Sequence, residues 1–262
     1  ALGGPHRAEA FKTRYEQADP FEGMPKYHYG SHYSCPGIVL QYLLRQYPYT
    51  EGAIELQGGK FDVADRLFHS IADTFASATE ELSDVRELVP EFFYLPEFLV
   101  NHDDLELGVR QDGVGVNNVI LPKWCNDNPH NFVLIHKAAL ESDHVSANLN
   151  QWVDLIFGFK QRGKEAEKAM NVFYHLTYEG AIDLDKIQDP DLRLSTETQI
   201  IHFGQTPPKI LNKPHPTKQK KDFLGIDYSI FSSNARIKVY RPINKNPAGG
   251  NQGNNVFGHP LG

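Results

Sequence analysis

The sequence predicts a mainly α-helical protein with little regular sheet and with long irregular segments that are too apolar to be solvent-exposed loops. Several stretches repeat apolar residues at helical spacing, whereas residues 1–208 contain no convincing series of alternating strands. The stretch PEFFYLPEFL, residues 90–99, is rich in aromatic residues but contains two prolines, which exclude a continuous helix. We expect this segment to be buried, so its backbone must find hydrogen-bond partners outside helices and sheets.

The first half of the chain contains three candidate helices. The first covers residues 8–18, and the second runs from Pro36 to the break at Pro48, because proline is favoured in the first turn of a helix. The third covers residues 60–82 and has the clearest pattern. Asp62 is its predicted N-cap. One apolar stripe is expected along it, formed by Ala64, Leu67, Phe68, Ile71, Phe75 and Ala78.

The second half begins with a loop-rich stretch, residues 101–128, and continues with four candidate helices. Asn128 is the expected N-cap of a helix over 129–142, and a further helix over 143–157 ends at Gly158. The apolar residues expected to face inward from the helix over 143–157 are Val145, Leu149, Trp152, Val153 and Ile156. A short helix over 164–171 and a last one over 190–203, with Asp189 as N-cap and Gly204 at its end, complete the set.

Composition limits the class of protein. Hydrophobic residues make up 40% and aromatic residues 11% of the 262 residues, which is enough for a buried core. No apolar run is long enough for a membrane span, and the N-terminus lacks the pattern of a signal peptide. Cys35 and Cys125 exclude a disulfide framework and favour reduced thiols in the cytosol, although a single bridge between them stays open.

Charge is distributed unevenly along the chain. Residues 1–208 contain 17 Lys and Arg against 31 Asp and Glu, whereas the remainder has a net charge of +7. The acidic body argues against nucleic acid as a partner. We interpret residues 218–262 as a basic, Gly- and Asn-rich solvated linker with a strand candidate at 235–240. Contact of Lys218, Lys220 and Lys221 with lipid or a partner is the alternative.

Two groups of residues are candidates for chemistry. His28 and His32 stand four apart, a spacing that metal ligands use, but Gly30 lies between them and no HExxH glutamate accompanies them. Hydrogen-bonded core histidines are therefore the favoured interpretation. Glu91 and Glu97 lie in the aromatic stretch, and leaving either carboxylate buried and unpaired would cost several kcal/mol. We expect both to organise backbone and pair with cations. Catalytic acid–base chemistry is the minor alternative, and we predict no cofactor and no metal.

A series of longer motifs in a fixed order carries a family resemblance. These motifs are HYGSHYS, LQGGKFDVADRLFHS, DVRELVPEFFYLPEFL, LPKW, ALESDHVSANLNQWVDLIFGFKQRG, NVFYHLTYEG and FGQTPPKIL. Residues 27–217 closely resemble a BEACH domain, named after the Beige and Chediak-Higashi proteins. They are most similar to members related to the autophagy-linked FYVE protein and to the factor associated with neutral sphingomyelinase. On this resemblance, we expect the N-terminal part of such a domain to be missing from the sequence.

The resemblance implies a BEACH-type fold, in which helices surround a core of extended, irregular segments. Residues 1–26 would be its run-in helix, and residues 218–262 would lead toward a WD-repeat propeller. It also implies a non-enzymatic scaffold in vesicle trafficking, lysosome-related organelles or selective autophagy. Its expected partners are a PH-like domain and the propeller of the same polypeptide, together with other trafficking or autophagy proteins. The expected location is the cytoplasm, in peripheral association with endomembranes.

Seven polar residues are expected to tie the irregular backbone to the helices: Asp62, Arg66, Glu91, Glu97, Glu141, Asp154 and Lys160. On this hypothesis the substitution Glu97→Ala lowers stability by several kcal/mol, because it strands a buried cation. The alternative functions are a lipid-binding module that uses the basic tail and, less favoured, a hydrolase that uses His28, His32 and a carboxylate.

Overall fold

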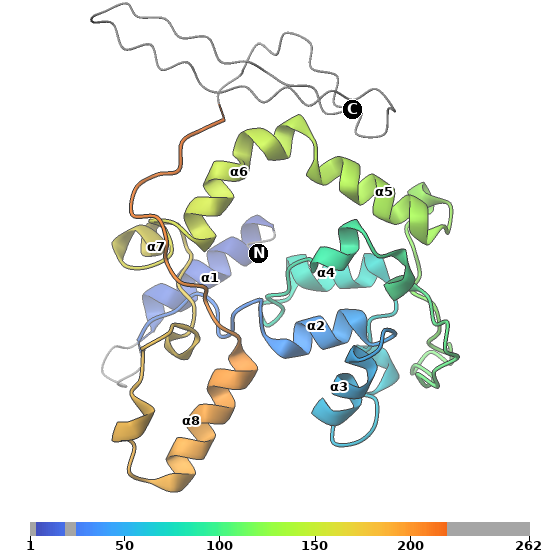
Figure 1. Cartoon of the computed structure of the whole chain (residues 1–262), viewed down its shortest axis with the longest axis horizontal. Coiled ribbons are helices and arrows are strands. Elements are labelled where there is room, and N and C mark those ends of the chain that lie inside the picture. Colours follow the sequence, from blue (N-terminus) through green and yellow to red (C-terminus); the bar gives the residue numbers. More distant parts are fainter. Residues whose placement is uncertain (1–3, 19–24, 219–262) are drawn as a thin grey trace, which may run out of the picture. The chain divides into compact units, whose positions relative to one another are not determined.

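The computed structural model describes residues 4–18 and 25–218. This part of the chain contains eight α-helices, connected by long irregular segments and short 3-10 turns (Figure 1). The helices are α1 (Pro5–Gln17), α2 (Pro36–Leu43), α3 (Tyr49–Leu56), α4 (Ile71–Glu80), α5 (Pro129–Leu140), α6 (Asp143–Ile156), α7 (Lys164–Lys168) and α8 (Pro190–Phe203). The β-structure seen in the described residues is limited to isolated bridges. The prediction of a mainly helical fold with little regular sheet is confirmed.

The aromatic stretch 90–99 lies in the larger of two hydrophobic clusters. It forms two 3-10 turns, η3 (Pro90–Phe93) and η4 (Pro96–Leu99), each with proline at its start. Phe92 and Phe98 are buried with ring centroids 4.9 Å apart, and Tyr42 of α2 packs edge-on against Phe92. The prolines therefore interrupt the helix while the aromatic rings fill the core, as the sequence predicts.

A second, smaller cluster attaches α1 to the body. Phe11 is completely buried there, with Tyr29, Val85 and Phe173 as its buried neighbours. The ring of Phe11 lies 4.8 Å from that of Tyr29, which in turn lies 5.1 Å from Phe173. Four segments that are distant in sequence thus meet in this cluster.

The prediction of one helix over residues 60–82 is wrong. The chain forms a 3-10 turn at Ala64–Arg66 and an extended stretch over 67–70, and α4 begins only at Ile71. The N-cap is Ser70, whose Oγ accepts from the N–H of Asp73, and not Asp62. The backbone of residues 69–71 instead pairs with Ile120, which buries Phe68 in the core but leaves Phe75 largely exposed. The helical spacing of apolar residues was misleading, because backbone hydrogen bonds to Ile120 replace the helical hydrogen bonds at this point.

The later helices agree more closely with expectation. Asn128 caps α5 and Asp189 caps α8, each through a side-chain oxygen, and α8 ends at Gly204. Helix α6 ends two residues before Gly158, but Leu149 and Trp152 are half exposed, so their predicted inward orientation is wrong. Helix α3 was not predicted, because Pro48 was interpreted only as a break, whereas it occupies the N-cap position of α3.

Candidate functional site

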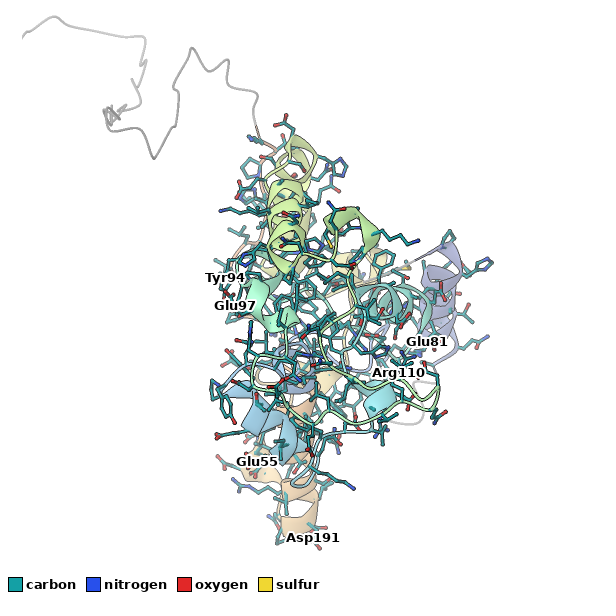
Figure 2. The ribbon with its side chains drawn as sticks, turned by 90° about the vertical axis from the view of Figure 1, so that its right-hand side faces the viewer. Glu55, Glu81, Tyr94, Glu97, Arg110 and Asp191 are labelled. Atoms are coloured by element: carbon teal, nitrogen blue, oxygen red, sulfur yellow. The ribbon has the colours of Figure 1, made fainter. Side chains whose placement is uncertain are left out.

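The seven polar residues predicted as a network lie at several separate places. Arg66 Nε donates to both oxygens of Asp62 at 3.1 Å, but the side chain of Arg66 is mostly in solvent. Glu91 accepts from the hydroxyl of Tyr94 at 2.9 Å. Glu97 and Glu141 are exposed, and Figure 2 shows Glu97 beside Tyr94 at the edge of the molecule. The expectation that Glu97 is buried is therefore wrong.

Asp154 contacts irregular backbone through its side chain, whereas the hydrogen bonds of Lys160 are made by its main chain. The carboxylate of Asp154 is buried on α6 and accepts from the N–H of His215 at 2.8 Å. The N–H of Lys160 donates to the carbonyl of Asp154, and the carbonyl of Lys160 accepts from Asn171 Nδ2. The contribution of the seven residues to stability stays a prediction.

Arg45 is the internal cation that the sequence reasoning missed. It is 1% exposed, and it donates from Nη1 to the carbonyl of Phe68 at 2.8 Å and from Nε to that of Asn117 at 2.9 Å. Burial lowers the pKa of Arg45 to about 10. The available signal was that Arg45 directly follows the apolar residues Leu43 and Leu44, just after the end of α2. Two irregular segments are thereby fixed by one guanidinium.

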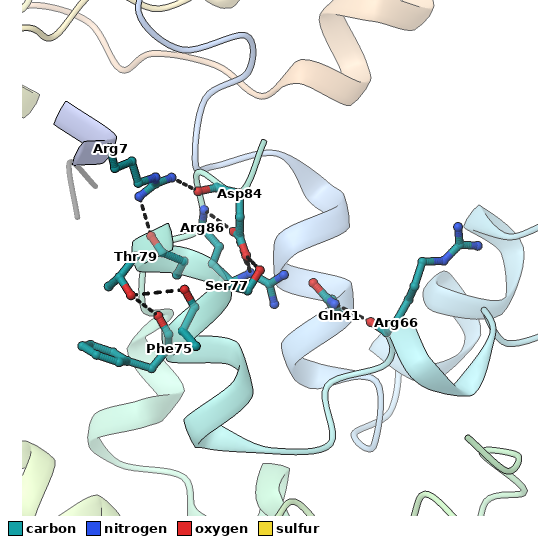
Figure 3. Close-up of polar contacts among 10 residues, drawn as sticks. Arg7, Gln41, Arg66, Phe75, Ser77, Thr79, Asp84 and Arg86 are labelled. Atoms are coloured by element: carbon teal, nitrogen blue, oxygen red, sulfur yellow. Dashed lines mark hydrogen bonds and ion pairs between the residues drawn. The ribbon is translucent and has the colours of Figure 1, made fainter. Parts of the chain in front are cut away.

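A second arginine connects α1 to the end of α4. Arg7 is buried and donates to the carbonyls of Ala78 and Asp84 (Figure 3). The Asp84 carboxylate accepts from Ser77 Oγ at 2.6 Å and forms an ion pair with Arg86 at 2.7 Å. Burial alone would raise the pKa of Asp84, but the hydrogen bonds from Arg86 and Ser77 outweigh it and lower that pKa.

His28 and His32 are both buried and engaged in hydrogen bonds. His28 stacks flat on Tyr15 with ring centroids 4.3 Å apart, and its Nδ1 accepts from the N–H of Val172. His32 Nδ1 accepts from the N–H of Ser34 and lies 2.7 Å from Ser34 Oγ. Burial lowers the pKa of each imidazole to about 4, so both are neutral at pH 7. These are the contacts of hydrogen-bonded core histidines. Across residues 4–18 and 25–218, no group of three or more His, Cys, Asp and Glu side chains could hold a metal ion.

An apolar groove of about 490 Å³ lies between α4, the segment 86–92, Pro122 and Trp124, and His136 of α5. Its rim carries three large apolar side chains that are 70%, 51% and 49% exposed, those of Phe75, Leu88 and Trp124. Tyr42 and Phe92 reach its floor from the core. We call this the apolar groove, and it is the candidate functional site.

Each wall of the apolar groove depends on a local feature of the sequence. The cap at Ser70 starts α4 so that Phe75 lies on its apolar stripe. The Asp84–Arg86 ion pair fixes the start of the second wall, and Trp124 lies in the 3-10 turn η5 (Lys123–Cys125). His136 of α5 closes the groove, 4.2 Å from the ring of Phe132, and burial lowers its pKa. Such a lining can take up apolar side chains. Sequence reasoning missed the groove, because it placed Phe75 inside.

Comparison with known sequences now identifies the family. The sequence model of the Beige/BEACH domain matches residues 2–218. The chain belongs to the BEACH family. This BEACH domain is 54% identical over 220 residues to the protein SPIRRIG of Arabidopsis thaliana and 51% identical over 215 residues to the BEACH domain-containing protein lvsD of Dictyostelium discoideum. These alignments cover 83% and 82% of the chain but only 6% and 7% of the relatives.

The family assignment confirms the predicted resemblance. The branch within the BEACH family and the subdivision into residues 1–26, 27–217 and 218–262 stay predictions. Lys218 is exposed and its ammonium contacts Ser146 Oγ, whereas Lys220, Lys221 and the strand candidate 235–240 lie outside the described residues. Among the described helices, none is long and apolar enough to span a bilayer.

Proposed function

We propose that this BEACH domain is a non-enzymatic scaffold module of a large protein, and that its apolar groove binds a PH-like domain of the same polypeptide. The exposed rim of the groove is the observation that carries the proposal. Large aromatic and aliphatic side chains that converge on one hollow are typical of binding surfaces, where a few of them supply most of the affinity. The chain spans only 6–8% of the length of the curated relatives, which leaves ample polypeptide to supply the partner.

The electrostatics of the groove favour an apolar partner. The charged members of its lining are Arg86 and Glu87, and Arg86 is already paired with Asp84, so an incoming apolar face does not have to neutralise that cation. The lowered pKa keeps His136 uncharged at pH 7, which avoids the cost of burying an ion under the partner. The proposed occupant is therefore an apolar face of the PH-like domain.

The cellular part of the proposal rests on the family. We place the scaffold in the cytoplasm, peripherally on endomembranes, in vesicle trafficking, lysosome-related organelle biology or selective autophagy. Its further partners would be a WD-repeat propeller of the same polypeptide and other trafficking or autophagy proteins.

A substitution in the groove tests the proposal. The isolated PH-like domain of the same polypeptide is titrated calorimetrically into the BEACH domain and into two variants, Phe75→Glu and Leu194→Glu. Phe75 and Leu194 are 70% and 64% exposed, so neither substitution should unfold the domain, but Leu194 lies on α8 away from the groove. We expect at least a tenfold weaker affinity for Phe75→Glu and no change for Leu194→Glu. Equal affinities, or a full-length polypeptide without a PH-like domain, would contradict the proposal.

Two alternatives predict other outcomes. A lipid-binding module that uses Lys218, Lys220 and Lys221 would float with anionic vesicles at low salt and lose them at high salt, whereas a protein scaffold would not distinguish the two conditions. A hydrolase that uses His28 and His32 receives less support, because both Nδ1 atoms already accept backbone N–H groups inside the core.

A further inference from the structure

Residues 204–218, here called the strap, connect the end of α8 to the last described residue without a helix or sheet. The first part of the strap is anchored in the body. The N–H of Thr206 donates to the carbonyl of Thr177 at 2.7 Å, and Gln161 Nε2 donates to the carbonyl of Pro207 at 2.8 Å. Thr177, Thr206 and Gln161 are all buried. This part is therefore built into the fold.

The second part runs antiparallel along α6. The N–H groups of Ile210 and Leu211 both donate to the carbonyl of Phe157, at 2.8 and 3.0 Å. The N–H of His215 donates to Asp154 Oδ1, and the ammonium of Lys218 reaches Ser146 Oγ. As the strap advances toward residue 218, its partners move back from the end of α6 toward its beginning.

Three polar side chains form a row of hydrogen-bond acceptors on one face of α6. Asp154, Asn150 and Ser146 are spaced four residues apart, which places their side chains above one another on a helix. Asn150 Oδ1 is buried and receives no hydrogen bond from the described residues, so the strap leaves one acceptor in the row open. The row suits an extended backbone, which offers N–H groups.

The two parts of the strap differ in burial. Of residues 212–218, only His215 is even partly buried, and its N–H donates to a carboxylate that is itself buried. Segments with few buried contacts open with a smaller free energy than the core around them. Within residues 212–218, the hydrogen bond from the N–H of His215 to Asp154 is thus the buried attachment to α6, which we call the anchor.

We infer that residues 212–218 are a releasable element, held on α6 by Asp154, and that this anchor fixes the point at which the chain leaves the domain. Loss of the His215–Asp154 hydrogen bond frees residues 212–218 while the first part of the strap and the helices stay in place. Release also frees the acceptor of Asp154, next to the acceptor of Asn150 that is already open, for another extended backbone. The inference does not depend on the apolar groove.

Hydrogen exchange of the whole chain, followed by mass spectrometry, tests this inference with three variants. Asp154→Ala removes the acceptor, Asp154→Asn retains an oxygen at the same place, and His215→Pro removes the donor without altering α6. We expect exchange of the His215 amide, which donates to Asp154, to accelerate at least tenfold in Asp154→Ala and by less than threefold in Asp154→Asn. Amides of α2, α5 and Thr206 should exchange as in the unaltered chain.

The exposed Glu141→Ala serves as the matched control, since it removes a carboxylate next to α6 without touching the strap. Three results would overturn the inference. One is faster exchange in α2 and α5 of His215→Pro. Another is no acceleration of the His215 amide in Asp154→Ala. The third is unprotected exchange of the His215 N–H in the unaltered chain. If Asp154→Ala fails to fold, the protection of the His215 amide in the unaltered chain and the exchange of α2 and α5 in His215→Pro still decide.

Discussion

The guanidinium of Arg45 donates a 2.8 Å hydrogen bond to the carbonyl of Phe68, in the centre of the larger hydrophobic cluster. Phe68 lies in the irregular stretch between η2 and α4, where its carbonyl accepts from Arg45 and not from a helix or sheet. An internal cation therefore fixes irregular backbone, as the sequence led us to expect. It is, however, a helix-end arginine, and not Glu97, that does so.

Substitution of Arg45 should be strongly destabilising. Arg45→Leu leaves the buried carbonyl of Phe68 without its donor, which costs about 1–3 kcal/mol, and removes a second hydrogen bond, to the carbonyl of Asn117. We expect the free energy of unfolding in urea to fall by about 2–5 kcal/mol. Arg66→Leu is the control, because Arg66 is mostly in solvent and its loss should leave the urea midpoint unchanged within error. Similar midpoints for both variants would refute the assigned role of Arg45.

Glu97→Ala should leave the melting temperature close to that of the unaltered chain. This replaces the expectation from sequence, because Glu97 is exposed and its carbonyl, which the substitution retains, accepts from Gln46 Nε2 at 3.0 Å. Gln46→Ala removes that donor and should cost about 1 kcal/mol. Calorimetry measures the melting temperature of both variants. A larger decrease for Glu97→Ala than for Gln46→Ala would restore the original hypothesis.

The stability should fall in mild acid because of His28 and His32. Their pKa is about 4 in the fold and about 6.5 in an unfolded chain, so below pH 6.5 only the unfolded state takes up the proton. The stabilisation is complete above pH 6.5 and is lost as the pH falls toward 4, up to about 3 kcal/mol for each histidine. Urea unfolding between pH 4.5 and 8 measures this loss.

A variant without the imidazole of His32 isolates the contribution of one of the two histidines to the pH dependence. In His32→Asn the amide oxygen can accept from the N–H of Ser34 as Nδ1 does, so about half of the pH dependence should disappear. His130→Asn, at an exposed position, should retain all of it. An unaltered slope in His32→Asn would show that this imidazole is not the titrating group.

The Asp84–Arg86 pair should contribute more than the neighbouring hydroxyl. Asp84→Ala leaves a largely buried guanidinium without its partner, for which we expect a loss of about 3 kcal/mol in unfolding free energy. Ser77→Ala removes one hydrogen bond to the same carboxylate and should cost about 1 kcal/mol. Urea unfolding of both variants gives the comparison, and the opposite order would contradict it.

Gly204 should tolerate no side chain. Its φ of +79° disfavours other residues, and an added Cβ would lie 2.6 Å from the backbone nitrogen of Cys35. Gly180 has a similar φ of +74° but open space around it, so Gly180→Ala reports the backbone strain alone. Thermal melting should show a larger loss for Gly204→Ala than for Gly180→Ala. Equal losses would mean that the close approach to Cys35 is relieved at little cost.

Local chemistry explains which elements could be predicted. Asn128, Asp189 and Gly204 act within one turn of the helices that they begin or end, so their roles are visible in the sequence. The prediction of one helix over 60–82 was wrong because the backbone of residues 69–71 pairs with Ile120, which lies about fifty residues away in the sequence. The apolar groove could not be predicted, since its lining comes from five separate segments of the chain.

The sequence by itself determined the family, the mainly helical fold and the burial of the aromatic segment 90–99, because long ordered motifs, helical periodicity and proline act along the chain. Tertiary structure decided which charges lie inside. Arg45 is buried because carbonyls from two distant segments surround its guanidinium, whereas Glu97 faces solvent although its neighbours Phe98 and Leu99 are buried. Whether a charge can be buried depends on hydrogen-bond partners that only the folded chain brings together.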